Sequence, residues 1–132
     1  MSAIHDNIIK SYTVDLENDT ISLNTVYYNG DVREETSIEF YHVMGHLFSN
    51  VLKNSILLDV YNHGMDHFIR DNKAALAKGE NYGWPVNHKG HDDLINILKQ
   101  NNQKYYVVRT SYGMDGWVLA EKMKINTEVK RD

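Results

Sequence analysis

The sequence predicts an α+β domain, in which a mainly antiparallel sheet of about six strands carries two or three helices packed on one face. Several short runs alternate apolar and polar residues, as half-buried strands do, and two other segments have helical spacing. Long strand–helix–strand repeats that would build a parallel sheet are missing. The 132 residues should form a single globular domain over 1–132, with frayed ends at 1–7 and 126–132.

The first part of the chain is a predicted three-stranded meander. Residues 11–16 and 21–27 alternate between apolar and polar side chains, and Glu17-Asn18-Asp19 between them favours a turn. Asn29-Gly30-Asp31 predicts a type I′ hairpin, because Asn-Gly tolerates the positive φ that this turn needs. A third strand should cover residues 32–40. One face of it is polar and should meet water: Arg33, Glu35, Ser37 and Glu39.

Residues 37–61 are the most apolar stretch, and the rest of the chain should pack against them. Their hydrophobic period changes twice. After the alternation that ends at Phe40, apolar residues follow i, i+3, i+4 spacing up to Val51, which predicts a short helix. Residues 56–60 alternate again, which predicts another strand.

The second part of the chain should contain two helices and a hairpin. Residues 65–78 predict a helix that Gly79 ends, and residues 79–90 predict a loop because they contain three glycines and the only proline. His91 or Asp92 could cap a second helix that runs to about residue 100. Strands at 104–110 and 117–123 should follow, joined by a turn at 112–116.

Composition restricts the class of protein. The absence of cysteine excludes disulfides, thiolate metal sites and cysteine nucleophiles. The first residues lack the features of a signal peptide, and no apolar run reaches the roughly 18 residues of a membrane span, so we expect a soluble cytoplasmic protein. The net charge is −4, with acids and bases interspersed, so neither nucleic acid nor a membrane is an expected partner.

Histidine spacing is the sharpest hint of chemistry. His42 and His46 are four residues apart, as are His63 and His67, and Asp66 lies inside the second pair. On a helix, imidazoles at this spacing share one face and could bind zinc or nickel. The zincin motif is incomplete, however, because Val43 stands where the essential glutamate would be. The sequence favours a structural role for both pairs, and no catalytic residue is assigned.

Aromatic residues next to glycine form the other candidate set. Large rings beside small residues are common at binding surfaces, because tyrosine and tryptophan offer a large contact area at a low entropic cost. They can equally be buried plugs at the ends of a sheet. His88, on the same loop as two of these rings, could act as an acid or base if the loop folds over the sheet. The candidate binding residues are Tyr82, Trp84, His88, Tyr112 and Trp117.

Three segments carry a resemblance to known proteins: F-x-x-V-x-x-H-x-F at residues 40–48, G-W-P at 83–85 and S-Y-G-x-x-G-W-V-L-A at 111–120. They resemble segments of small uncharacterised bacterial proteins, some of which lie beside polymorphic toxins and are regarded as immunity proteins. The resemblance spans most of the chain. It implies a protein-binding role and carries over no active site.

The sequence therefore predicts a small protein-binding domain, immunity-like, that neutralises a partner by covering its surface. An acidic chain suits a basic protein partner, since complementary charge raises the association rate. The alternative is a metal-binding protein or metal-dependent enzyme that uses zinc or nickel at His42, His46, His63, His67 and Asp66. A further possibility is a small-molecule pocket under the loop at 79–90.

Overall fold

The computed structural model describes residues 4–131, and the strands in that range form one antiparallel sheet in the order β4-β7-β6-β5-β1-β2-β3-β8. The predicted α+β class and antiparallel sheet are confirmed. The strands are β1 (Ile8–Asp15), β2 (Thr20–Asn29), β3 (Val32–Tyr41), β4 (Gly45–Ser49), β5 (Ile56–Asn62), β6 (Lys104–Tyr112), β7 (Asp115–Ala120) and β8 (Lys122–Arg131). The helices are α1 (Phe68–Asp71), α2 (Lys73–Gly79) and α3 (His91–Gln100), with short 3₁₀ segments η1 (Met65–His67) and η2 (Glu80–Tyr82).

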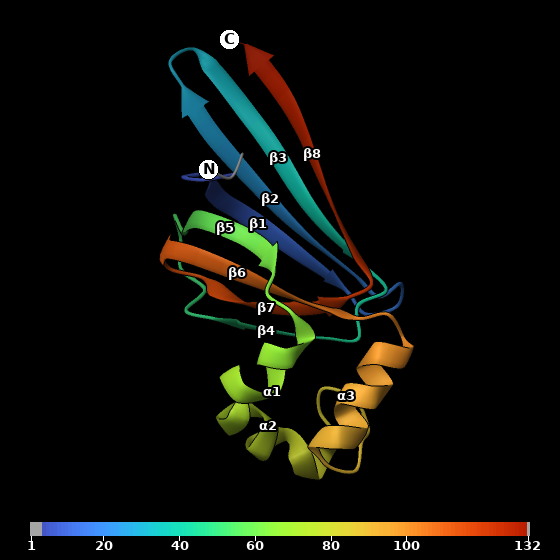
Figure 1. The fold of residues 1–132 in the computed structure, drawn as a ribbon. Coiled ribbons are helices and arrows are strands. Elements are labelled where there is room, and N and C mark those ends of the chain that lie inside the picture. The colour runs from blue at the N-terminus through green and yellow to red at the C-terminus, as the bar shows by residue number, and fades with distance from the viewer. Residues whose placement is uncertain (1–3, 132) are drawn as a thin grey trace.

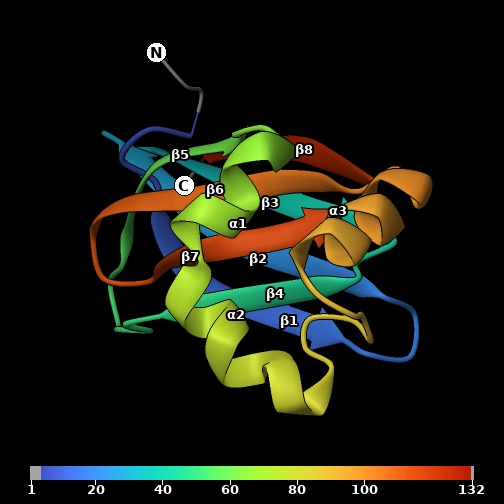
Figure 2. The same ribbon diagram turned by 60° about the horizontal axis from the view of Figure 1, so that its bottom comes forward.

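The sheet is bent so that its two halves face each other (Figure 1). At the centre, β1 and β5 share a single residue pair, Ile8 with Ile56. On the opposite side of the molecule the chain passes from β7 of one half into β8 of the other through Glu121, whose N–H donates to the Tyr41 carbonyl at 3.0 Å. The helices lie under the β4–β7–β6–β5 half, and Figure 2 shows them in front of β7 and β4. The result is a three-layer arrangement.

Two apolar cores occupy the spaces between these layers. The first joins the two halves of the sheet, and the rings of Phe40 and Tyr106 meet there with centroids 5.6 Å apart. It contains Ile4, Ile9, Ile21, Leu23, Ile38, Phe40, Leu57, Val60, Tyr106, Val108, Met114, Val118 and Ala120. The second lies between sheet and helices and contains Phe68, Leu76, Leu94, Leu98, Tyr105, Trp117 and Leu119. Adjacent residues on β6 and β7 enter different cores, because side chains alternate along a strand.

The prediction of a short helix at residues 40–51 is wrong, because no helix forms there. β3 continues through Tyr41, the chain turns at His42 with a φ of 55°, and β4 follows. The apolar spacing arises because Leu47 packs toward the helices while Phe48 packs against the first core. The predicted last strand at 117–123 is likewise two strands, divided at Glu121. These two differences explain why the sheet has eight strands instead of about six.

The helices depart from prediction in smaller ways. The helix at 65–78 is interrupted at Asn72, whose φ of −124° is not helical, and Gly79 belongs to α2 instead of following it. α3 is confirmed, but its N-cap is Gly90 and no side chain caps it. At the β2–β3 turn only Gly30 has a positive φ, of 63°, which fits a type II′ turn instead of type I′.

The structure describes residues 4–7 and 126–131 of the two segments that are expected to fray. Ile4 and Asn7 are buried, and the Asn7 carbonyl accepts the Leu57 N–H at 2.8 Å. Residues 126–131 pair with residues 32–37 of β3. Residues 1–3 and 132, part of the same expectation, lie outside the described residues. No helix within residues 4–131 is long and apolar enough to cross a membrane.

Candidate functional site

A groove of about 620 Å³ lies on the helix side of the sheet, bounded by β4, β7, β6, β5 and the end of α1. Alternation along β6 points Tyr105, Val107 and Arg109 to this side, while Tyr106 and Val108 enter the first core. α1 covers only one end of this face, so the remainder stays open. We refer to this hollow as the α1 groove.

Asn72, at the C-cap of α1, links the helix to the floor of the groove. Its Oδ1 accepts the indole N–H of Trp117 at 2.7 Å. Its Nδ2 donates to the Phe68 carbonyl at 2.9 Å and to the Tyr105 hydroxyl at 3.1 Å. One amide thus closes the helix and fixes two aromatic rings. A helix of four residues, as α1 is, has little stability of its own, so these contacts and the packing of Phe68 position it.

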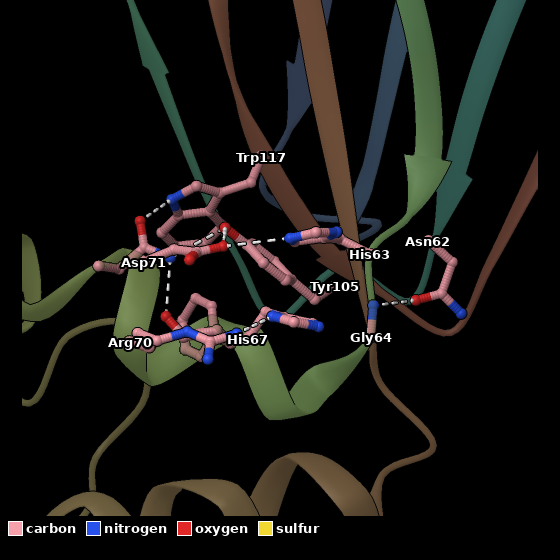
Figure 3. A network of polar contacts seen from close by, with 10 residues as sticks. Asn62, His63, Gly64, His67, Arg70, Asp71, Tyr105 and Trp117 are labelled. Atoms are coloured by element: carbon pink, nitrogen blue, oxygen red, sulfur yellow. Dashed lines mark hydrogen bonds and ion pairs between the residues drawn. The ribbon is translucent and has the colours of Figure 1, made fainter.

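Tyr105, Asp71 and His63 continue the polar network along one wall (Figure 3). The Tyr105 hydroxyl donates to Asp71 Oδ2 at 3.3 Å, and His63 Nε2 lies 3.6 Å from the same oxygen. Burial, together with the nearby Asp71 charge, raises the pKa of Tyr105 to about 12. Tyr105 therefore remains a protonated donor throughout the physiological range.

The two histidines of the second pair, His63 and His67, lie next to each other beside this network. The rings of His63 and His67 stack with centroids 4.3 Å apart and planes 24° from parallel. Arg70 contacts His67 Nδ1, and Tyr61 meets His63 edge to face at 5.6 Å. The wall is therefore a row of aromatic and planar groups, and Asp71 joins it through its contacts with Tyr105 and His63.

These features define what the α1 groove can bind. Tyr61 supplies accessible aromatic surface, while Tyr105 and Trp117, 3% and 4% exposed, form the buried floor beneath it. Asp71 and Asp115 supply negative charge, and Arg109 is the one arginine of the lining. Aromatic faces and carboxylates together recognise cationic groups. The ring of His63 contacts Asp71, Tyr61, His67 and Tyr105.

The candidate binding residues from the sequence do not form one site. Trp117 lies on the floor of the groove, and Trp84 packs against its far side with centroids 5.6 Å apart. Tyr82 is 89% exposed and, together with Trp84, lines another apolar hollow of about 400 Å³ beside α2. Tyr112 is exposed at the end of β6, and His88 Nδ1 is bound to the Val86 carbonyl at 2.7 Å.

The candidate metal ligands are also dispersed. The helix that was to align His42 and His46 does not form: His42 lies at the turn after β3, 3.9 Å from Glu121, while His46 lies on β4. Only His63 and His67 come together, and Asp66 is exposed on η1. Among residues 4–131, no three histidine, aspartate or glutamate side chains form a group that could hold a metal ion.

Sequence reasoning missed Tyr61, Asp71, Asn72, Tyr105 and Arg109. A signal was present in the run K-Y-Y-V-V-R-T, whose alternate residues Tyr105, Val107 and Arg109 share one face of a strand. The interruption at Asn72 had no equivalent signal, because the helical period continues across it.

Asn72→Ala should lower the free energy of unfolding by about 2 kcal/mol or more, because Trp117 and Tyr105 each lose a partner in a largely buried setting. The matched control is Asn101→Ala. Asn101 makes the same i−4 bond, to the Ile97 carbonyl at 2.8 Å, but at an exposed site. Urea denaturation of both variants measures the difference, and equal losses would contradict the bridging role of Asn72.

The pKa of His46 gives the protein a pH-dependent stability. Burial lowers this pKa below 6.5. As pH falls through 6.5 the unfolded chain therefore takes up the proton first, and the free energy of unfolding decreases until the lower pKa of the folded state is passed. His46→Gln should flatten this decline between neutral pH and about pH 5. Thermal melts across this range test it, and an unchanged pH profile in the variant would contradict it.

The chain was also compared with known proteins. No protein-family model matches it, and a search of curated proteins finds no match.

Proposed function

We propose that this protein binds a protein partner through the α1 groove and receives a basic side chain of that partner beside Asp71. The observation that carries the proposal is the way the groove is built. The rings of Tyr105 and Trp117 are held by Asn72, so the aromatic floor is in place before any partner arrives. A preorganised surface loses less entropy on binding.

The composition of the groove supports a protein partner. Tyrosine and arginine are among the residues that most often dominate the binding energy of protein interfaces. Tyr61 and Arg109 line this hollow, above the buried ring of Trp117. The groove is open along the sheet beyond α1. This shape suits a partner that inserts one side chain and rests the surface around it on the sheet. The resemblance to presumed immunity proteins supports neutralisation of the partner by occlusion as the role.

Charge supports a basic partner. Two carboxylates, Asp71 and Asp115, line the groove against one arginine, Arg109, and the whole chain carries a net charge of −4. Complementary charge raises the rate of association and makes it sensitive to salt. A lysine or arginine from the partner would lie between the aromatic wall and Asp71, where cation–π and ionic contacts add.

The test is a co-purification from cells that encode the chain, with three tagged forms. The groove variant is Tyr61→Ala combined with Asp71→Asn, which removes one ring and one charge but keeps the Asn72 contacts. The control is Ser37→Ala, on the polar outer face of β3. A partner should be retained by the wild type and the control, and its affinity for the groove variant should fall at least about tenfold. Equal retention by all three forms would refute the proposal, as would the absence of any partner.

A further inference from the structure

Among residues 4–131, β8 is the last strand of the sheet, and no strand pairs with its outer edge. It is ten residues long and pairs with β3 over its whole length on the other side. Figure 1 shows it as the outermost strand of its half, beside β3. A long exposed edge presents backbone N–H and C=O groups that can pair with another strand.

Two apolar side chains of β8 are exposed along this edge. Ile125 is 43% exposed and Val129 is 55% exposed, although both project to the side of the sheet that carries the first core. Each lies beside β3 on one side, and no strand of the described part of the chain lies on the other. A further strand beside β8 would cover them.

We infer that the strand is supplied by a second copy of this chain, whose β8 pairs antiparallel with the first around a two-fold axis at Asn126. In this register Lys124 of each copy faces Glu128 of the other, and this happens twice by symmetry. Met123 faces Val129 and Ile125 faces Thr127, so apolar groups meet on the inner side. Opposite charges and apolar pairs at facing positions stabilise antiparallel strands.

The charges within one chain favour this arrangement. Glu128 faces another carboxylate, Glu35, across the β3–β8 ladder, and like charges at facing positions are unfavourable. Glu35 already forms a salt bridge with Lys130, at 2.9 Å between Lys130 Nζ and Glu35 Oε1. Lys124 of a second copy would give Glu128 a cation on its free side. At each end of the register Lys122 faces Lys130, but the contact of Lys130 with Glu35 offsets that repulsion.

Symmetry selects β8 over the other free edge as the partner strand. β4, at the opposite edge of the sheet, has only five residues. Pairing β8 with β4 would match ten positions with five and would extend without closing. Pairing β8 with itself matches the full length and closes as a dimer. This β8 contact does not involve the α1 groove. The tests of the dimer and of the proposed function can therefore give opposite results.

A charge swap tests the dimer. The wild type should have twice the 15.3 kDa mass of one chain by light scattering at high concentration. Glu128→Lys removes the repulsion from Glu35 but opposes Lys124 across the axis, so its dissociation constant should rise about tenfold or more. Lys124→Glu should weaken the dimer in the same way. An equimolar mixture of the two variants restores both charge pairs and should dimerise again.

Hydrogen exchange on the wild type provides a second readout that needs no variant. In a dimer the β8 amides on both edges of the strand are protected, whereas in a single chain protection alternates along the strand. A monomer at every concentration from micromolar to millimolar would overturn the inference. So would a dimer that neither variant weakens, or alternating exchange along β8 in the dimer.

Discussion

Gly116→Ala should be among the most destabilising single substitutions in this protein, with a loss of more than about 3 kcal/mol in the free energy of unfolding. Gly116 has a φ of 154° and faces Phe48 across the β4–β7 ladder. A Cβ there would lie 2.9 Å from the carbonyl carbon of Leu47 and closer still to its oxygen. Those atoms are backbone, so β4 itself would have to move, and with it one wall of the α1 groove.

The control for this substitution is Gly30→Ala. Gly30 also has a positive φ, of 63°, but no atom of residues 4–131 lies within 4 Å of a Cβ at that position. Only the conformational penalty applies there, and the expected loss is about 1 kcal/mol. Urea denaturation separates the two variants, and hydrogen exchange should show faster exchange of the β4 amides in Gly116→Ala alone. Equal losses would mean that β4 does not approach β7 as closely as described.

Phe68→Ala should cost about 3–5 kcal/mol, the usual range for a buried phenylalanine. Phe68 is fully buried, and its ring meets those of Tyr105 at 5.2 Å and Trp117 at 5.0 Å. Because α1 is only four residues long, this side chain is its main apolar attachment to the sheet. We therefore expect the loss of Phe68 to loosen α1 and to change the fluorescence of Trp117.

Two controls accompany Phe68→Ala. Phe68→Leu keeps most of the volume and should lose less than half as much stability. Leu16→Ala truncates a side chain that is 81% exposed and should change the free energy by less than about 0.5 kcal/mol. A loss at Phe68 no larger than at Leu16 would contradict the attachment of α1 through this residue.

The sequence predicts most of the fold because most helices and strands have a recognisable hydrophobic pattern within their own residues. A strand or helix that buries one face repeats apolar residues at its own structural period. This explains the alternation in residues 11–40 and 104–110 and the helical period of residues 91–100. Residues 40–51 mislead for the same reason. Leu47 and Phe48 are adjacent, and both face apolar layers, so β4 does not alternate and its neighbours fall into helical spacing.

The bend of the sheet and the candidate site are less predictable, because they depend on contacts between distant segments. Nothing near Glu121 indicates that β7 and β8 belong to different halves of the sheet. The α1 groove is formed by Asn72 and Trp117, which are 45 positions apart. Trp117 was a candidate from the sequence, whereas Asn72 has no distinctive local pattern. The histidine spacing is a local pattern, but it depended on a helix at 42–46 that does not form.

The role of the α1 groove is tested most directly by side-chain NMR of the chain with and without its purified partner. We expect the signals of Tyr61, Arg109 and the Trp117 indole to shift on binding, while those of Ser37 on the outer face of β3 do not. Shifts confined to that outer face, with the groove signals unmoved, would contradict it.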